Sequence, residues 1–206
     1  MTKIKICGLK RPEDIEIVNE VKPDYAGFVF AKSPRQVEEE LSAELRRRMD
    51  PLIRTVGVFV NAPIQKVAKL SRAGIIQMVQ LHGDEDAAYI EELRKHLTGI
   101  PIMKAVRVKS GEDILQAARL DVDYLLLDAY VKGVYGGSGT SFDKSVIPSV
   151  EKPYFLAGGL NEENVLGQIK ACRPFAVDVS SAVETDGCKD VDKVKKFVER
   201  VRRNES

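Results

Sequence analysis

The sequence contains no tryptophan, only two histidines and three cysteines, and its charges nearly cancel. Lys plus Arg number 32 against 31 Asp plus Glu, which leaves a net charge of +1. So small a net charge provides no broad positive field for a phosphate backbone, and nucleic acid is not an expected partner. No segment approaches the roughly 20 apolar residues that a membrane-spanning helix needs, so we expect no membrane association.

The three cysteines, Cys7, Cys172 and Cys188, are far apart and contain no pair at the close spacing typical of metal sites. An odd number of widely separated thiols does not predict a disulfide framework. The first residues lack the continuous apolar core of a signal peptide, and we therefore expect a cytoplasmic protein.

Short runs rich in Val, Ile, Phe and Tyr alternate along the chain with segments of helical periodicity. Several of these runs are almost continuously apolar, which is typical of parallel strands covered on both faces. The last helical segment places Val194, Phe197, Val198 and Val201 on one stripe. Strands are predicted at residues 3–7, 25–30, 55–60, 75–82, 102–108, 123–129, 153–158 and 175–180.

Eight strand-helix units in a chain of 206 residues predict a single (β/α)8 barrel, a TIM barrel of the α/β class. The alternative is a doubly wound open sheet, which usually has about five to seven strands and needs no eighth unit. No linker, low-complexity segment or charge block interrupts the series, so we predict one domain over residues 1–206.

The active site of such a barrel lies at the carboxyl ends of the strands. Polar residues at the last position of a strand, or in the loop that follows it, are therefore candidates for function. This criterion selects Cys7, Arg35, Asn61, His82, Arg107, Asp128, Gly158, Gly159, Asp178, Ser180 and Ser181.

Two of these loops have the composition of a phosphate site. LAGGL leaves the seventh strand with Gly158 and Gly159, and DVSSAVE leaves the eighth with Ser180 and Ser181. Loops after these two strands form a recurrent phosphate site, because free backbone N–H groups and a helix dipole converge there. Gly137, in the run GGSG, adds a third set of closely approaching amides. Singly, the glycines also fit tight turns and Ser181 a helix N-cap, but together they favour phosphate binding.

Cys7 and Asp128 are expected to face each other across the mouth of the barrel. A free cysteine is often simply buried, and its ordinary pKa of about 8.5 leaves the thiol mostly protonated at neutral pH. Asp128 ends a very apolar strand, where a carboxylate must either be paired or reach the mouth.

Arg35 follows Pro34, which stiffens the loop after the second strand. A planar guanidinium held over the mouth suits a carboxylate or a phosphate ligand. The alternative is a surface ion pair with Glu38 or Glu39.

Characteristic blocks follow one another from residue 3 to about residue 184: KICGL, FVFAKSPRQV, GVFVN, QLHG, LLLDA followed by GGSG and FD, LAGGL and DVSSAVE. In order and spacing they resemble the phosphoribosylanthranilate isomerase family. The resemblance implies a (β/α)8 barrel that carries out an Amadori rearrangement, a step of tryptophan biosynthesis. Its substrate would be N-(5-phosphoribosyl)anthranilate and its product 1-(2-carboxyphenylamino)-1-deoxyribulose 5-phosphate.

The resemblance also implies roles for the candidates. Asp128 matches the general acid that protonates the ribose ring oxygen, and Cys7 matches the general base that takes the proton from C2′. Arg35 matches the residue that holds the anthranilate carboxylate. The others match substrate-binding or phosphate-binding positions: His82, Asp178, Gly137, Gly158, Gly159, Ser180 and Ser181.

This chemistry makes sense on physical grounds. A cationic imine acidifies the neighbouring C–H bond, so a modest base suffices and we expect neither a metal ion nor an organic cofactor. For Asp128 to act as an acid, its pKa must rise well above the reference of about 3.9. For Cys7 to act as a base, the iminium or a nearby cation must lower the pKa of the thiol.

Three positions depart from the family pattern: Ser138 stands where Thr is common, Lys144 where an aromatic residue often follows Asp, and Ala182 where Gly is usual. They bear on affinity and loop detail rather than on the reaction.

Two other hypotheses remain. One is a different phosphosugar barrel, an aldose-ketose isomerase with paired aspartates or an indole-glycerol-phosphate-forming synthase with Lys and Glu at strand ends. The other is a catalytically silent phosphosugar-binding barrel. The expected partner is a small phosphosugar-anthranilate substrate, and the chain is expected to be a monomer or a homodimer.

Overall fold

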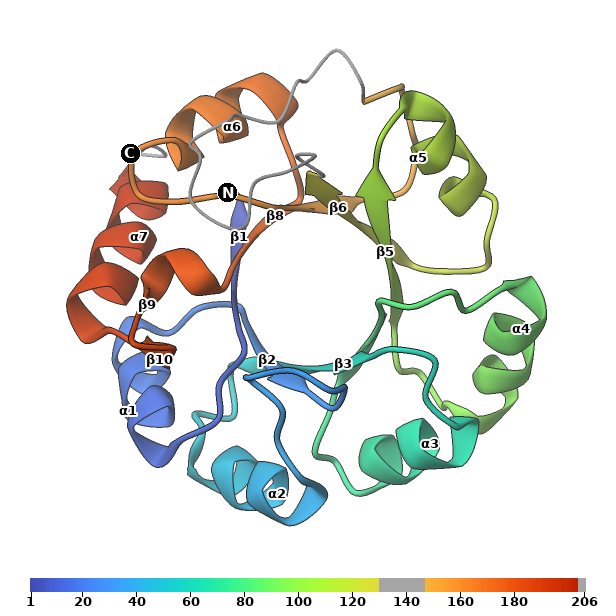
Figure 1. The fold of residues 1–206 in the computed structure, drawn as a ribbon, viewed down its shortest axis with the longest axis horizontal. Helices are drawn as coiled ribbons and strands as arrows, with labels where there is room; N and C mark the ends of the chain where they lie inside the picture. Colours follow the sequence, from blue (N-terminus) through green and yellow to red (C-terminus); the bar gives the residue numbers. More distant parts are fainter. Residues whose placement is uncertain (130–146, 204–206) are drawn as a thin grey trace.

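The computed structural model describes residues 1–129 and 147–203. The GGSG run with Gly137, and the departures at Ser138 and Lys144, lie outside the described residues. Eight parallel strands close into a barrel in chain order, and helices surround it (Figure 1). The strands are β1 (Lys3–Cys7), β2 (Tyr25–Val29), β3 (Arg54–Phe59), β4 (Met78–Leu81), β5 (Ile102–Val108), β6 (Tyr124–Ala129), β7 (Tyr154–Ala157) and β8 (Ala176–Val179).

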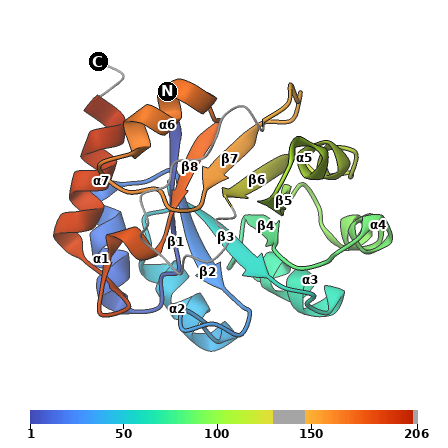
Figure 2. The ribbon, with the colours of Figure 1, turned by 45° about the horizontal axis from the view of Figure 1, so that its top comes forward.

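The prediction of a (β/α)8 barrel is confirmed, since all eight predicted strands are present in one closed sheet. The helices are α1 (Pro12–Val21), α2 (Glu39–Arg48), α3 (Ile64–Arg72), α4 (Ala87–His96), α5 (Gly111–Ala118), α6 (Val165–Cys172) and α7 (Val191–Arg203). The barrel closes where β1 pairs with β8, and α1 and α7 lie side by side outside this seam (Figure 2).

The fourth predicted strand begins too early, because Ile75 and Ile76 precede β4 and are buried in the loop that enters it. After β8, Ser181–Val183 forms a short 3-10 helix. It leads into a hairpin that the strand pattern did not reveal, β9 (Glu184–Thr185) and β10 (Cys188–Lys189).

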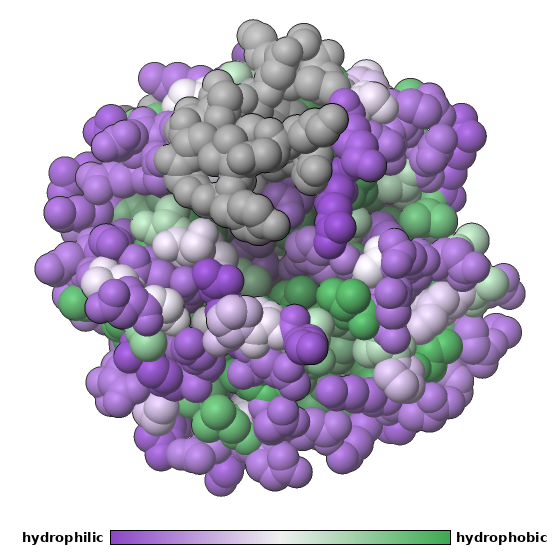
Figure 3. Space-filling model, in the orientation of Figure 1, coloured by the Kyte–Doolittle hydropathy of each residue, from purple (hydrophilic) through white to green (hydrophobic). Residues whose placement is uncertain are grey.

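The apolar core has two parts. The larger part lies between the strands and the helices, where residues such as Phe28, Phe59 and Phe197 have no exposed surface. The smaller part fills the barrel interior with side chains that include Tyr25 and Phe155, whose rings meet edge to face at 5.2 Å. Hydrophilic residues cover most of the outer surface seen in Figure 3.

The interior core explains which residues reach the mouth. Side chains alternate between the two faces of a strand, so the residue two positions after an interior one points to the same side. Leu126 belongs to the interior core and Asp128 follows it at the end of β6, just as Ala176 is followed by Asp178 on β8. The fold therefore carries both carboxyl groups to the carboxyl ends of their strands.

None of the helices in the described ranges has the length and apolar character needed to cross a membrane. Among the same residues, His, Cys, Asp and Glu side chains do not gather in groups of three or more that suit a metal ion.

Candidate active site

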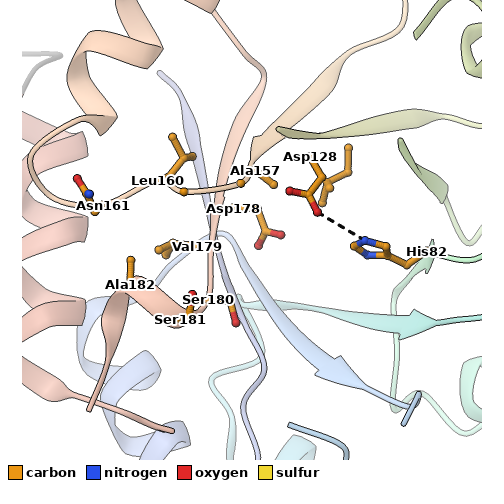
Figure 4. A pocket seen from close by; sticks show the side chains of 13 residues that line it. His82, Asp128, Ala157, Leu160, Asn161, Asp178, Val179, Ser180, Ser181 and Ala182 are labelled. Carbon is orange, nitrogen blue, oxygen red and sulfur yellow. Dashed lines mark ion pairs between the residues drawn. The ribbon is translucent and has the colours of Figure 1, made fainter. Parts of the chain in front are cut away.

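A cavity of about 510 Å³ lies at the carboxyl ends of β6, β7 and β8 (Figure 4). It brings together residues that are up to 100 positions apart in the sequence, from His82 to Ala182. Seven of the predicted site residues line it: His82, Asp128, Gly158, Gly159, Asp178, Ser180 and Ser181. The predicted substrate and phosphate positions therefore belong to one cavity.

Asp128 holds a carboxyl group in this cavity whose pKa is raised from 3.8 to about 6. Burial is the main cause, and the negative charge of Asp178 adds to it, while the positive charge of Arg107 acts in the opposite direction. The pKa shift that an acid at this position requires is thus present. Near neutral pH, a useful fraction of Asp128 carries the proton that a general acid must donate.

His82 faces Asp128, with its Nε2 atom 3.8 Å from the Asp128 carboxylate (Figure 4). Burial, together with the charges of Lys5, Arg107 and Lys104, lowers the pKa of His82 to about 4, so the ring is neutral at pH 7. The contact is therefore not an ion pair at that pH. Gln80 Nε2 lies 3.0 Å from His82 Nδ1.

Asp178 is paired inside the barrel with Lys5, whose Nζ atom lies 2.9 Å from Asp178 Oδ1. The side chain of Lys5 has no exposed surface, and that of Asp178 is 10% exposed. The two residues stand opposite each other in the register of β1 and β8, which places the ion pair on the closing seam of the barrel. A lysine buried this deeply needs such a partner to remain charged.

Cys7 lies two residues after Lys5 on β1, on the same face of the strand. Burial raises the pKa of the Cys7 thiol, and the charge of Lys5 and a hydrogen bond with its side chain oppose that rise. In the free protein the burial effect prevails, so the thiol is protonated at neutral pH. A base at this position would therefore need a further positive charge close to the sulfur.

Neighbouring strands fix the position of the Cys7 side chain. Gly27 stands opposite Cys7 in β2, and a Cβ atom at Gly27 would lie only 2.7 Å from the Cys7 sulfur. On the other side, Ser180 Oγ donates a hydrogen bond to the Cys7 carbonyl at 3.0 Å. The lack of a side chain at Gly27 thus makes room for the thiol, while Ser180 ties the end of β1 to the loop after β8.

The two predicted phosphate loops meet in the cavity. Gly158 and Gly159 have φ values of +82° and +67°, which favour glycine. The next helix, α6, begins only at Val165, and the Asn161 side chain accepts backbone N–H bonds from Glu163 and Asn164 in the loop before it. Ser181 is not an N-cap either, because the position before the 3-10 helix is Ser180.

Cys7 and Arg35 are not part of the wall of this cavity as the described residues form it. Arg35 makes a bidentate ion pair with Glu184, 149 positions away in the sequence, rather than the alternative pair with Glu38 or Glu39. The prediction that Arg35 holds a ligand carboxylate is compatible with this pairing, since a guanidinium has further N–H groups.

Sequence reasoning missed several polar residues around the site: Lys5, Gln80, Glu184 and Lys189. For Lys5 the signal was present, because the alternation in KIKIC places it on the same face as Cys7. For Glu184 and Lys189 the signal was the dipeptide Asp186-Gly187, which is typical of a two-residue hairpin turn.

Comparisons with known proteins agree with this geometry. The family model described as N-(5′-phosphoribosyl)anthranilate (PRA) isomerase matches residues 4–200. The N-(5′-phosphoribosyl)anthranilate isomerase of Thermoanaerobacter pseudethanolicus is 47% identical over 204 residues, which cover 98% of each chain. The crystal structure of phosphoribosyl anthranilate isomerase from Thermotoga maritima has a TM-score of 0.86 and 34% identity, covering 98% of this chain and 100% of that one.

A further similar structure is that of a phosphoribosyl anthranilate isomerase in complex with reduced 1-(o-carboxyphenylamino)-1-deoxyribulose 5-phosphate. Its TM-score is 0.81 at 32% identity, and the match covers 98% of this chain and 100% of that chain. The ligand in that relative carries both a phosphate and an aromatic carboxylate.

Proposed function

The chain belongs to the N-(5′-phosphoribosyl)anthranilate isomerase family, and from this premise we propose that it converts N-(5-phosphoribosyl)anthranilate to 1-(2-carboxyphenylamino)-1-deoxyribulose 5-phosphate. This is an Amadori rearrangement in tryptophan biosynthesis, and the chain is an enzyme of the isomerase class. The reaction opens the ribose ring, moves one hydrogen from C2′ to C1′ and leaves a ketone at C2′.

Asp128 serves as the general acid of the first step. Its carboxyl group gives a proton to the ring oxygen while the C1′–O4′ bond breaks, and the nitrogen lone pair forms the C=N bond of an iminium. A pKa of about 6 supports this role, because the carboxyl group is neither fully ionised at neutral pH nor too weak an acid to donate.

Cys7 serves as the general base of the second step. When the iminium forms and lowers the pKa of the thiol, Cys7 loses its own proton to solvent. The thiolate then takes the C2′ proton, and the electrons of that C–H bond form the C1′=C2′ bond as the iminium nitrogen regains its lone pair. The resulting enolamine becomes the ketone when C1′ gains a proton and the C2′ hydroxyl loses one. The positive charges of Lys5 and Lys189 both favour the thiolate, and the iminium adds to them.

The remaining side chains bind the substrate. The loops of Gly158 and Gly159 and of Ser180 and Ser181 suit the phosphate, since they meet in one cavity at the carboxyl ends of β7 and β8. Arg35 is the cation for the anthranilate carboxylate. No step calls for a metal ion or an organic cofactor, because the iminium itself withdraws the electrons.

One observation carries the proposal: a carboxyl group with a pKa of about 6 stands in the same cavity as the two loops suited to phosphate. A silent phosphosugar-binding barrel would have no need of such an acid. A barrel with paired aspartates at the ends of β1 and β6 is not supported either, since β1 ends in Cys7.

The test is turnover of N-(5-phosphoribosyl)anthranilate by the purified protein, followed by the loss of anthranilate fluorescence. Asp128→Asn and Cys7→Ala should each abolish turnover while the circular dichroism spectrum stays that of the wild type. Full rates in both variants would show that the assigned roles are wrong. Calorimetric binding without product in the wild type would favour the silent barrel instead.

A further inference from the structure

Arg35, from the loop after β2, forms a chain of charges with Glu184 and Lys189, from the loop after β8. Arg35 Nε donates to Glu184 Oε1 at 2.7 Å, and Arg35 Nη2 donates to Glu184 Oε2 at 2.6 Å. Lys189 Nζ donates to Glu184 Oε1 at 2.5 Å and to the Ser180 carbonyl at 3.1 Å. The Glu184 carboxylate therefore joins the loop after β2 to the loop after β8.

Burial shows that these contacts belong to the interior rather than to the solvated surface. The side chains of Glu184 and Lys189 are 6% and 1% exposed, while that of Arg35 is 28% exposed. Glu184 is held as an anion, since hydrogen bonds from Arg35 and Lys189 outweigh the effect of burial and lower its pKa to about 2. A buried pair of this kind constrains the exposed end of Arg35.

The hairpin after β8 builds the arrangement. Glu184 and Lys189 stand directly opposite each other in the antiparallel pair of β9 and β10. The turn between them, at Asp186 and Gly187, has φ values of +51° and +71°, as a two-residue hairpin turn requires. The same turn that closes the hairpin therefore brings the lysine and the glutamate together.

The pairing uses only one side of the guanidinium. Arg35 engages Glu184 with Nε and one hydrogen of Nη2, which is the side-on geometry. The end of the guanidinium, with hydrogens on Nη1 and Nη2, presents a second fork of parallel N–H groups that matches another carboxylate. Arg35 and Lys189 carry two positive charges and Glu184 carries one negative charge. The three side chains together therefore keep one net positive charge that can bind an anionic ligand.

The place of Arg35 relates this second fork to the reacting groups. A Cβ atom at Gly8 would lie 2.4 Å from Cδ of Arg35 and 3.3 Å from Oγ of Ser180, so the stem of Arg35 crosses the residue that follows Cys7. Ser180 in turn belongs to the wall of the cavity. The stem of Arg35 therefore passes close to the proposed general base and to the loop after β8.

We propose that Glu184 is a positioning residue for substrate selection: it holds Arg35 side-on so that the free fork receives the aromatic carboxylate, and Lys189 keeps the trio positive. This inference rests on the proposed function, because it explains how the site selects an N-glycoside whose aromatic ring bears an ortho carboxylate. The opposite relationship would make Glu184 a competitor that the substrate carboxylate must displace from Arg35. If Glu184 positions Arg35, removing the charge of Glu184 raises KM, whereas if Glu184 competes with the substrate, removing that charge lowers KM.

Glu184→Gln separates them, since it keeps the size of the side chain but removes the charge and one acceptor. We expect KM for N-(5-phosphoribosyl)anthranilate to rise about tenfold, the worth of one charge-assisted hydrogen bond, and kcat to change less than about twofold. Glu91→Gln is the matched control, because Glu91 is an exposed residue on α4 and the loss of its charge should leave KM unchanged. An unchanged or lower KM in Glu184→Gln would overturn the proposal.

A substrate without the carboxylate shows whether the effect passes through Arg35. With N-(5-phosphoribosyl)aniline, wild type and Glu184→Gln should have the same KM. If Glu184→Gln instead raises KM equally for both substrates, Glu184 has only a structural role. Should Glu184→Gln fail to fold, Arg35→Lys gives the same comparison, since lysine keeps the charge without the fork and should lose affinity only for the carboxylated substrate. Failure of the wild type to turn over the anthranilate substrate would count against the proposed function rather than against Glu184.

Discussion

The ammonium nitrogen of Lys5 lies 2.9 Å from a carboxylate oxygen of Asp178, inside the barrel and two residues before Cys7 on the same face of β1. The positive charge of Lys5 also acts on the Cys7 thiol and opposes the rise of its pKa. One buried ammonium group thus serves a carboxylate of the cavity and the thiol of the proposed base. Removing the ammonium group should change both the free energy of unfolding of the protein and the pKa of the Cys7 thiol, and the two effects can be measured separately.

Replacing Lys5 with methionine should slow alkylation of Cys7 by iodoacetamide, because removing the cation raises the pKa of the thiol further. The single variant also leaves Asp178 unpaired, at a cost of about 3–5 kcal/mol in the free energy of unfolding. The double variant Lys5→Met/Asp178→Asn should recover most of that stability but not the alkylation rate. Lys3→Met, which removes a half-exposed lysine of the same strand paired with Asp24, is the control, and mass spectrometry resolves the alkylated site. Wild-type alkylation in Lys5→Met would show that Lys5 does not act on the thiol.

The pKa of Asp128 should move in opposite directions in two variants. Asp178→Asn removes a negative charge that raises the pKa, so the value should fall from about 6 toward the ordinary range. Arg107→Gln removes a positive charge that lowers it, so the value should rise. Carbon-13 NMR of the labelled carboxyl group measures both shifts. Shifts of the same sign in the two variants would mean that the charges act by changing the structure rather than through the field.

Asp128→Asn should raise the melting temperature at pH 7 even though it abolishes turnover. The pKa of Asp128 is about 6 in the folded protein against an ordinary value of 3.8, so ionisation at neutral pH favours the unfolded chain. This cost is fully present above about pH 6 and fades as the pH falls through 3.8, because the carboxyl group is then protonated in both states. Thermal unfolding of wild type and variant at pH 7 and at pH 4 checks the sign. An equal rise in melting temperature at pH 7 and at pH 4 would show that the variant acts through packing rather than through ionisation of Asp128.

The sequence allowed prediction of the barrel and of most of the cavity wall for one reason: strand ends in a parallel barrel meet at a single mouth. Knowing which residue ends each strand was enough to bring Asp128, Asp178 and the Gly158 and Ser180 loops together. Contacts among side chains did not follow in the same way. Asn61 satisfied the criterion equally well, yet its side chain accepts the Asp84 backbone N–H and serves the loop after β4.

The charged network was beyond such reasoning because its members come from separate loops. The sequence suggested that Arg35 pairs with Glu38 or Glu39, a few residues ahead of it, whereas the hairpin after β8 supplies Glu184 from across the closing seam. The alternation in KIKIC and the Asp186-Gly187 turn indicate where Lys5 and Lys189 lie, but only the structure shows that both are buried against carboxylates. Periodicity predicts which way a side chain points, but not which loop will meet it.

Gly27→Ala tests whether the exact placement of the Cys7 sulfur matters for the reaction. An added Cβ at Gly27 would stand 2.7 Å from that sulfur and 3.1 Å from the Cys7 Cα, so the thiol has to move. Such overpacking costs about 1–3 kcal/mol in stability. A displacement of about 1 Å in a reacting group lowers kcat by on the order of 100-fold.

The matched control is Gly167→Ala on α6, where an added Cβ meets no atom within 4 Å and a helix gains about 1 kcal/mol. We therefore expect Gly27→Ala to remain folded with KM nearly unchanged and kcat strongly reduced, while Gly167→Ala keeps full activity. Steady-state kinetics at saturating substrate, with a melting curve for each variant, gives the comparison. A wild-type kcat in Gly27→Ala would contradict the assignment of Cys7 as the general base, because removal of the C2′ proton requires the sulfur to be in its native position.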